Sequence, residues 1–320
     1  MISQNTVLVL GAGASFHCGY PLGQSLYNRI LKDLETMTID FEETLAFRTR
    51  GNFENLRADI KLLELGYSAE AIVNFRQALL YADRPSVDKF LERRQDLIEI
   101  GKVCISQALI LYERNIPITN REGNNWYQLL FSEMDSSIDD FSNNRLSIIT
   151  FNYDRSLEHY LFGAIKHTYG IKDDQLVAKL VDSIPIVHVH GQLDLLPWQA
   201  KAKEGTREHG GRLTKEALIR ASQAIKIIHE DVEKDKEFVK ARSLIKEADR
   251  VFFLGFGYDI TNLSRLDMKS NDKNQFIGTG LGMTPNLHSK VKGFFKSLDR
   301  EIVLLEGVDI VTFFQETRFY

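Results

Sequence analysis

The sequence predicts an α/β fold: a Rossmann-like, doubly wound parallel sheet with an inserted helical subdomain and no zinc module. Short apolar runs alternate with helical patterns, which is typical of strand–helix units in a parallel sheet. The first run, at residues 7–10, is followed at once by the glycine turn Gly11-Ala12-Gly13-Ala14-Ser15. A mainly helical stretch at 39–135 then precedes the next strand pattern, and it is too long for a simple crossover.

The first strand and turn lead into helices. Four apolar residues then recur at helical spacing: Leu22, Leu26, Ile30 and Leu34. Within the helical stretch, Ser86 is expected as an N-cap and Asn124 or Asn125 as the start of a later helix. The pattern from residue 87 to 111 fits one long helix or two. We therefore expect a sheet domain at 1–38 and 136–320, and a helical subdomain at 39–135.

Strand patterns resume after the helical stretch. The expected strands are Leu146–Thr150, 184–190, Arg250–Leu254, 275–278 and 301–305, with 308–314 as a further edge element. The segment 200–212 is charged, rich in glycine and without periodicity, so we expect a mobile, solvated loop. Because it follows a strand end, a lid or a partner contact is the alternative.

Composition narrows the function classes. The chain has 320 residues and a formal net charge of -4, so it lacks the basic footprint of a nucleic-acid-binding protein. Its apolar runs are too short to span a membrane, and no secretory leader pattern precedes the first strand. Two cysteines, Cys18 and Cys104, are too few for a four-cysteine zinc site and favour a cytoplasmic location.

Polar and glycine residues gather where the predicted strands end. In open α/β sheets, ligands bind outside the carboxyl ends of the strands. Those ends carry the glycine turn, Asn152 with Asp154, His190 with Gly191, and Gly255 with Gly257. The set contains a base, an amide able to orient a water or hydroxyl, and a carboxylate.

Five short motifs, in family order, resemble the sirtuin superfamily, and specifically its divergent bacterial branch of NAD-consuming domains. They are Gly11-Ala12-Gly13-Ala14-Ser15 (G-A-G-x-S), Ser86-Val87-Asp88…Phe90-Leu91 (S-[IV]-D-x-F-L), Thr150-Phe151-Asn152-Tyr153-Asp154 with Leu157-Glu158 (T-x-N-x-D…L-E), His190-Gly191 (H-G) and Gly255-Phe256-Gly257 (G-x-G). The resemblance spans most of the chain.

The resemblance implies an enzyme with NAD as its substrate, hydrolysed to nicotinamide and ADP-ribose or a cyclic product. It assigns catalysis to Asn152 and His190. It assigns NAD binding to Gly11, Ala12, Gly13, Ser15, Asp154, Gly191, Gly255 and Gly257, with the pyrophosphate on the amides of the glycine turn. By analogy with this branch, NAD depletion would serve antiphage defence. Restraint of such an activity would come from a homo-oligomer, a translocase-type ATPase partner or the 200–212 loop.

Two departures from deacylating sirtuins favour hydrolysis. No cysteine occurs from residue 192 to 250, where those enzymes carry four zinc ligands. The first loop reads Gly19-Tyr20-Pro21-Leu22-Gly23 and lacks the family's Phe-Arg pair. A dehydrogenase is set aside because the fingerprint's third glycine is replaced by Phe16 and no acidic residue closes a second strand. The alternatives are a protein deacylase or ADP-ribosyltransferase, and a non-catalytic module that senses NAD or ADP-ribose.

The chemistry agrees with these roles. Cleaving the nicotinamide–ribose bond forms an oxocarbenium-like transition state and a neutral leaving group. His190 would act as general base, and Asn152 would bind the ribose or the attacking water.

Several residues also allow plainer interpretations. Asp154 is expected to cap the following helix. His188, on the same face as His190 by strand alternation, is expected to pack, with support of a site residue as the alternative. Asp194 either pins the 200–212 loop or lies in a surface turn. His209 is expected to be solvated, and Cys18 to be a small buried residue.

Overall fold

The computed structural model describes residues 1–47, 61–115, 125–200, 205–227, 234–269 and 274–317. Its centre is one six-stranded sheet in the order β3-β2-β1-β4-β5-β6. The strands are β1 (Thr6–Leu10), β2 (Leu146–Thr150), β3 (Ile186–His188), β4 (Arg250–Leu254), β5 (Gln275–Gly280) and β6 (Ile302–Glu306). All neighbouring strands pair in parallel, which confirms the predicted doubly wound sheet.

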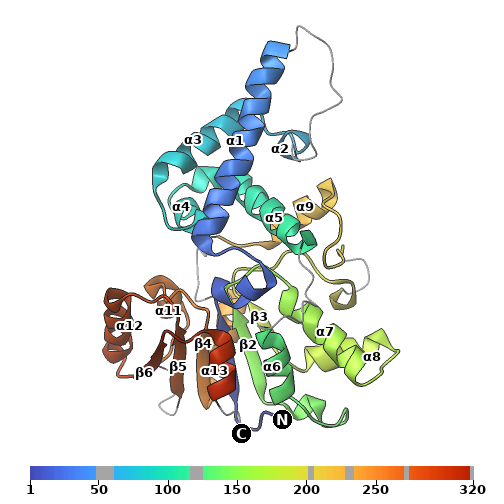
Figure 1. Ribbon diagram of the computed structural model, residues 1–320, viewed down its shortest axis with the longest axis vertical. Coiled ribbons are helices and arrows are strands. Elements are labelled where there is room, and N and C mark those ends of the chain that lie inside the picture. The colour runs from blue at the N-terminus through green and yellow to red at the C-terminus, as the bar shows by residue number, and fades with distance from the viewer. Residues whose placement is uncertain (48–60, 116–124, 201–204, 228–233, 270–273, 318–320) are drawn as a thin grey trace.

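Helices cover both faces of the sheet (Figure 1). One face packs against α7 (Ser156–Thr168), α8 (Asp174–Asp182) and α13 (Ile310–Glu316), and its strands contribute Leu8, Ile148 and Phe252 to that core. The other face packs against α10 (Lys236–Glu247), α11 (Ile260–Arg265) and α12 (Pro285–Ser297), with Val9 and Phe253 in its core. Alternate residues of each strand thus serve opposite faces, as strand geometry requires.

The C-terminal segment corrects one prediction. We expected an edge element at 308–314, but the chain there forms α13, which begins after Asp309. The Asp309 side chain accepts a hydrogen bond from the Thr312 main-chain N–H at 2.7 Å and so caps the helix. Phe313 and Phe314 are buried against the sheet, so the apolar pattern there belongs to a helix and β6 is the edge strand.

The predicted helical stretch forms a helical region that stands at one end of the sheet (Figure 1). It contains α1 (Gly23–Phe47), α2 (Lys61–Glu64), α3 (Ala69–Ala82), α4 (Val87–Leu91) and α5 (Ile98–Asn115). Ser86 caps α4 by accepting from the Lys89 N–H at 3.2 Å, as predicted. A short 3₁₀ turn, Gln95–Leu97, separates α4 from α5, so the pattern from 87 to 111 is two helices.

Two helices pack on the part of the molecule to which the expected domain division does not assign them. The segment α6 (Trp126–Glu133), capped by Asn125, packs beside the sheet, where Trp126 stacks on Phe314 at 5.6 Å between ring centroids. In contrast, α9 (Lys215–Ala224) follows β3 in the chain but packs on α5. The boundaries at 38/39 and 135/136 stay a prediction, and α1 runs continuously through the first of them.

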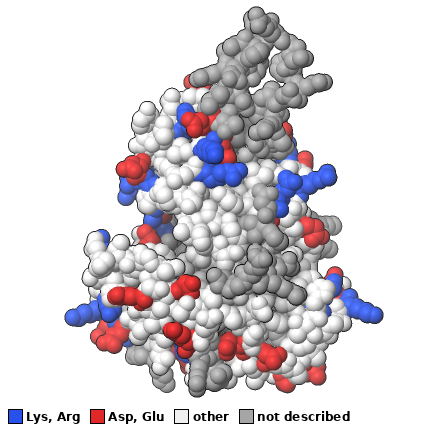
Figure 2. Space-filling model, viewed as in Figure 1, with Lys and Arg blue, Asp and Glu red and all other residues white. Residues whose placement is uncertain are grey.

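On the face drawn in Figure 2, acidic and basic side chains of the described residues are mixed over the upper part. Acidic side chains predominate across the lower half, so this face shows no dominant basic region. None of the described helices combines the length and apolar character needed to cross a bilayer.

Candidate active site

The glycine turn after β1 meets the turn after β4 at the point where the strand order reverses. Gly13 donates its N–H to the Gly255 carbonyl at 2.9 Å, and Gly11 donates to the Leu254 carbonyl at 3.2 Å. A Cβ on Gly255 would lie 2.3 Å from the Ala14 nitrogen. Glycine is therefore required because two backbones touch here.

This close packing changes the role of the turn's amides. The N–H groups of Gly11, Gly13 and Ala14 all donate to main-chain carbonyls within the protein. Ala12 is exposed and lines the adjacent cavity. Among the residues of the turn, Ala12 is thus the one placed to meet a ligand with its main chain.

Ser15 lies in a 3₁₀ helix, Ala12–Cys18, and is buried. It donates to the Asp154 carboxylate at 2.6 Å. Asp154 also accepts from the main-chain N–H of Ser156 at 3.2 Å and from the Ser156 hydroxyl, so it holds the start of α7 as predicted. Burial raises the pKa of Asp154, while the bonds from Ser15 and Ser156 oppose that shift. Ser15 and Asp154 are both buried, and neither lines the cavity.

Asn152 is held by its side-chain nitrogen. Its Nδ2 donates to the Gly11 carbonyl at 2.8 Å and to the Ser15 hydroxyl oxygen at 3.0 Å. A carbonyl oxygen only accepts, so the Asn152 nitrogen must face the turn and Oδ1 must point the other way. Asn152 lines the cavity, and its fixed amide therefore offers an acceptor, Oδ1, for a ligand or water.

His190 lies on the same cavity wall as Asn152 and is half-buried. Its ring contacts Phe151 edge-on, with 5.3 Å between ring centroids, and lies 6.1 Å from the ring of Phe238 on α10. Its main-chain oxygen accepts from the Lys226 N–H at 2.7 Å, which ties the turn to the end of α9.

The expectation that His188 and His190 share a face is wrong. The strand ends at His188, and a turn closed by the Gly191 N–H and the His188 carbonyl redirects His190. His188 is buried, with its Nε2 2.6 Å from Oε1 of Glu158 on α7. It is therefore an ion-paired residue and not simply a packed one.

The cavity has a volume of about 530 Å³ and is walled by the ends of β1, β2, β3 and β4 and by α4. The sequence assigned no role to the wall that α4 supplies. There Asp88 accepts a hydrogen bond from the Tyr153 hydroxyl at 2.6 Å. Lys89 Nζ lies 3.1 Å from Glu92 Oε2 and 3.5 Å from Asp259 Oδ1. The S-V-D…F-L motif could have predicted this wall, because it places the Asp88 carboxylate in the first turn of a capped helix.

Gly257 lines this cavity after β4, and Gly191 packs against the end of α9. Gly191 has a φ of 75°, and a Cβ on it would lie 2.0 Å from the Ala224 carbonyl oxygen. It lets the end of α9 approach the His190 turn.

Replacing Gly191 by alanine is expected to lower the free energy of unfolding by about 3 kcal/mol, because the positive φ and the backbone clash both resist a side chain. Urea denaturation measures this. Gly257→Ala is the matched control, since no atom lies within 4 Å of a Cβ there. Equal stability of the two variants would contradict the account.

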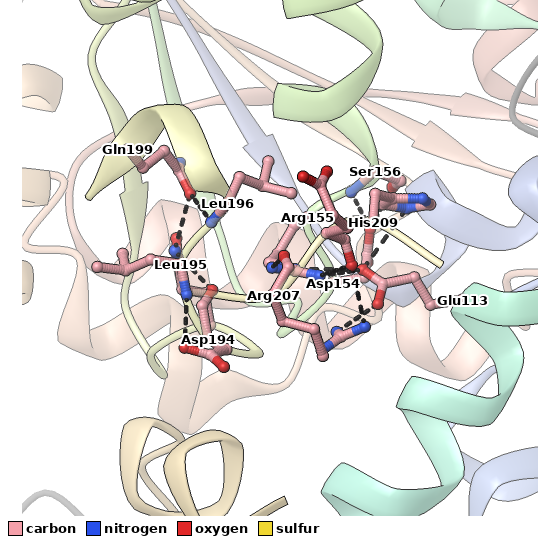
Figure 3. A network of polar contacts seen from close by, with 12 residues as sticks. Glu113, Asp154, Arg155, Ser156, Asp194, Leu195, Leu196, Gln199, Arg207 and His209 are labelled. Atoms are coloured by element: carbon pink, nitrogen blue, oxygen red, sulfur yellow. Dashed lines mark hydrogen bonds and ion pairs between the residues drawn. The ribbon is translucent and has the colours of Figure 1, made fainter. Parts of the chain in front are cut away.

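A buried ionic cluster lies next to the site and joins three parts of the chain (Figure 3). Glu113 of α5 accepts from Arg155 Nη2 at 2.8 Å and pairs with Arg207, and the Glu113 and Arg155 side chains are fully buried. Arg155 Nη1 also donates to the Arg207 carbonyl at 2.9 Å. The cluster connects the helical region, the start of α7 and the segment after β3.

The cluster corrects our expectations for the 200–212 loop. Residues 201–204 lie outside the described part, but 205–212 is held in place and is not a free solvated loop. His209 is mostly buried and stacks on His159 at 4.3 Å, so it is not solvated. Burial, followed by the nearby His159 and arginine cations, lowers the pKa of His209 to about 3.

Asp194 contributes to the same anchoring. It is buried and accepts from Arg220 Nε at 3.0 Å, and Arg220 in turn donates to the Thr206 carbonyl at 3.1 Å. Of the two alternatives for Asp194, the structure shows the one that pins the loop.

The two cysteines are free and buried, and burial raises the pKa of Cys18 to about 12, which leaves it inert as a nucleophile. Within the described residues, no group of three or more His, Cys, Asp and Glu side chains is arranged to hold a metal ion.

Comparisons with known proteins give matches among solved structures only: no protein-family model and no curated protein matches the chain. One is a crystal structure of Sir2 with the inhibitor EX-527, 2'-O-acetyl-ADP-ribose and a deacetylated p53 peptide, at 15% identity and a TM-score of 0.31. Another is a Sir2 mutant with a p53 peptide and NAD, at 14% identity and a TM-score of 0.31. Each match covers 97% of this chain and 90% of the Sir2 chain. At this TM-score, the likeness adds nothing to the strand order and site geometry described above.

Proposed function

We propose that the chain hydrolyses NAD to nicotinamide and ADP-ribose, or to a cyclised product, in the cavity at the ends of β1 to β4. The observation that carries this proposal is the meeting of Asn152, His190 and Ala12 on one cavity wall, although they come from three different strand ends. The order and spacing of the sequence motifs support NAD as the substrate.

The chemistry needs a polar and rigid pocket more than a strong acid. Nicotinamide leaves NAD as a neutral molecule, so no proton has to be supplied to it, and positive charge develops on the ribose. In this proposal His190 takes a proton from a ribose hydroxyl or from the attacking water. Asn152 Oδ1 accepts a hydrogen bond from the same group and orients it, because the amide is already locked by Gly11 and Ser15.

Other residues of the cavity have distinct parts in the proposal. The Ala12 main chain approaches the pyrophosphate, and Gly257 allows the nucleotide to lie close to the turn after β4. Gly255 lets that turn pack on the glycine turn. Asp88 presents a carboxylate, oriented by Tyr153, that stabilises the charge on the ribose. Gly11 lines the cavity beside Ala12, and Gly13, Ser15 and Asp154 support the glycine turn from behind. Gly191 supports the His190 turn.

Replacing Asn152 by alanine is expected to lower the kcat of nicotinamide release about 100-fold, since one preorganised hydrogen-bonding group is lost. A time course of NAD consumption by the purified chain measures this. Asn143→Ala, on an exposed turn before β2, is the control. Unchanged turnover in Asn152→Ala would contradict the assignment of the site.

The same assay separates the competing functions. Adding an acyl-lysine peptide distinguishes hydrolysis from deacylation, because strict dependence of nicotinamide release on the peptide would indicate a deacylase. Transfer of ADP-ribose to protein would indicate an ADP-ribosyltransferase. Tight NAD binding without turnover would indicate a sensing module.

The cellular part of the proposal rests on the motif resemblance. We place the activity in the cytoplasm, as NAD depletion in antiphage defence, restrained by self-association or by a translocase-type ATPase. Phage plating on cells that carry the wild type or Asn152→Ala tests the role. Light scattering of the purified chain, with and without the products of neighbouring genes, measures self-association and partner binding and so tests how NAD turnover is restrained.

A further inference from the structure

A second histidine lies behind the candidate site and has no role in the proposed reaction. His188 ends β3, and its Nε2 is 2.6 Å from Glu158 Oε1 on α7. Its Nδ1 is 2.9 Å from the main-chain oxygen of Asn152. The His188 and Glu158 side chains are 8% and 4% exposed, so both contacts are shielded from water.

The hydrogen-bond partners determine where the protons are. The Asn152 carbonyl only accepts, so His188 Nδ1 must carry a proton. His188 Nε2 and Glu158 Oε1 are close enough for a hydrogen bond, which needs a second proton between these two atoms. Burial disfavours the imidazolium, but the contacts with Glu158 and the Asn152 carbonyl, together with the charge of Asp154, raise the pKa of His188. An imidazolium that donates from both nitrogens fits both contacts, and charge strengthens its bond to Asn152.

The two ends of Asn152 are therefore held by different groups. Gly11 and Ser15 fix its side chain, and His188 fixes its main chain. We infer that His188 and Glu158 form a positioning pair that sets the place of Asn152 at the cavity wall, an inference that rests on the proposed function for its effect on turnover. A displacement of about 1 Å in a catalytic group can cost about 100-fold in rate.

Three substitutions of His188 separate positioning from stability. His188→Asn keeps a donor near the position of Nδ1, facing the Asn152 carbonyl. His188→Gln keeps a donor near the position of Nε2, facing Glu158, and loses the bond to Asn152. His188→Leu loses both. We expect kcat within about tenfold of wild type for His188→Asn, which loses the contact with Glu158 but keeps the bond to Asn152. We expect kcat about 100-fold lower for His188→Gln and His188→Leu.

The partner and the control complete the set. Glu158→Gln keeps a hydrogen-bonding partner for Nε2 and should fall less in kcat than Glu158→Leu. Val187→Ala removes buried volume from the neighbouring residue of β3, whose side chain packs on the other face of the sheet. It should lower Tm and keep kcat within about twofold of wild type, because the change does not share a partner with Asn152.

Amide hydrogen exchange over residues 151–155 gives a readout that needs no substrate. We expect faster exchange there in His188→Gln than in His188→Asn, and wild-type exchange in Val187→Ala. The inference is overturned if His188→Asn and His188→Gln are equal in exchange over this segment, or if their kcat values simply follow Tm together with Val187→Ala. An inactive wild type would contradict the proposed function alone, and the exchange comparison would still decide the positioning role.

Discussion

Replacing His190 by alanine is expected to abolish most NAD turnover, with kcat reduced by about 100- to 10,000-fold, the usual contribution of a general base. The imidazole lies on the cavity wall, beside the place where the proposed reaction puts the ribose hydroxyl or water that loses its proton. Alanine keeps the main-chain bond from Lys226, so the local turn should survive. Nicotinamide release, followed by chromatography, measures the loss.

The control for His190→Ala is His167→Ala, an exposed histidine in the last turn of α7. It removes an imidazole from the surface and should leave kcat unchanged. Circular dichroism and thermal unfolding of both variants show whether the fold is retained. A His190→Ala enzyme that is folded and turns over NAD within threefold of wild type would show that the base lies elsewhere.

Replacing Glu113 by alanine is expected to lower the free energy of unfolding by about 3–5 kcal/mol, because two buried arginines lose their counter-charge. Arg155 and Arg207 both pair with this single carboxylate, and each arginine side chain is at most 4% exposed. Among the ion pairs of the described residues, no second carboxylate pairs with both arginines. Urea denaturation followed by fluorescence measures the loss.

Glu99→Ala is the matched control for Glu113→Ala. Glu99 lies on the same helix, α5, but is exposed, so its loss should cost less than about 0.5 kcal/mol. We also expect faster proteolysis of Glu113→Ala in the segment 205–212, since Arg207 holds that segment to the cluster. A loss below about 1 kcal/mol in Glu113→Ala would show that the arginines find other partners or water.

The positions of the strand ends could be predicted from local sequence patterns. Leu10 lies opposite Thr150 and Leu254 in the parallel register, so the glycine turn, the Asn152 loop and Gly255 emerge at one level of the sheet. This follows from the apolar runs and the topology rule for ligand sites. The sequence pattern therefore predicts that Asn152 and His190 lie near one another.

Several predictions differ from the structure because the residues concerned have partners far away in the chain. His209 was expected in solvent, yet Glu113, separated from it by nearly a third of the chain, and His159 enclose it. The edge element at 308–314 became a helix because its apolar residues pack against the sheet and Asp309 supplies a cap. Short apolar runs fit a strand or a buried helix equally well.

By itself, the sequence determined the α/β class, the parallel sheet and the glycine turn, because hydrophobic periodicity and glycine's backbone freedom act over a few residues. Only the tertiary structure decided that Asp88 of the helical region lines the cavity and that His188 pairs with Glu158. It also decided that main-chain N–H groups of the glycine turn donate to carbonyls within the protein. Those contacts join residues far apart in the chain, and their geometry depends on how whole elements pack.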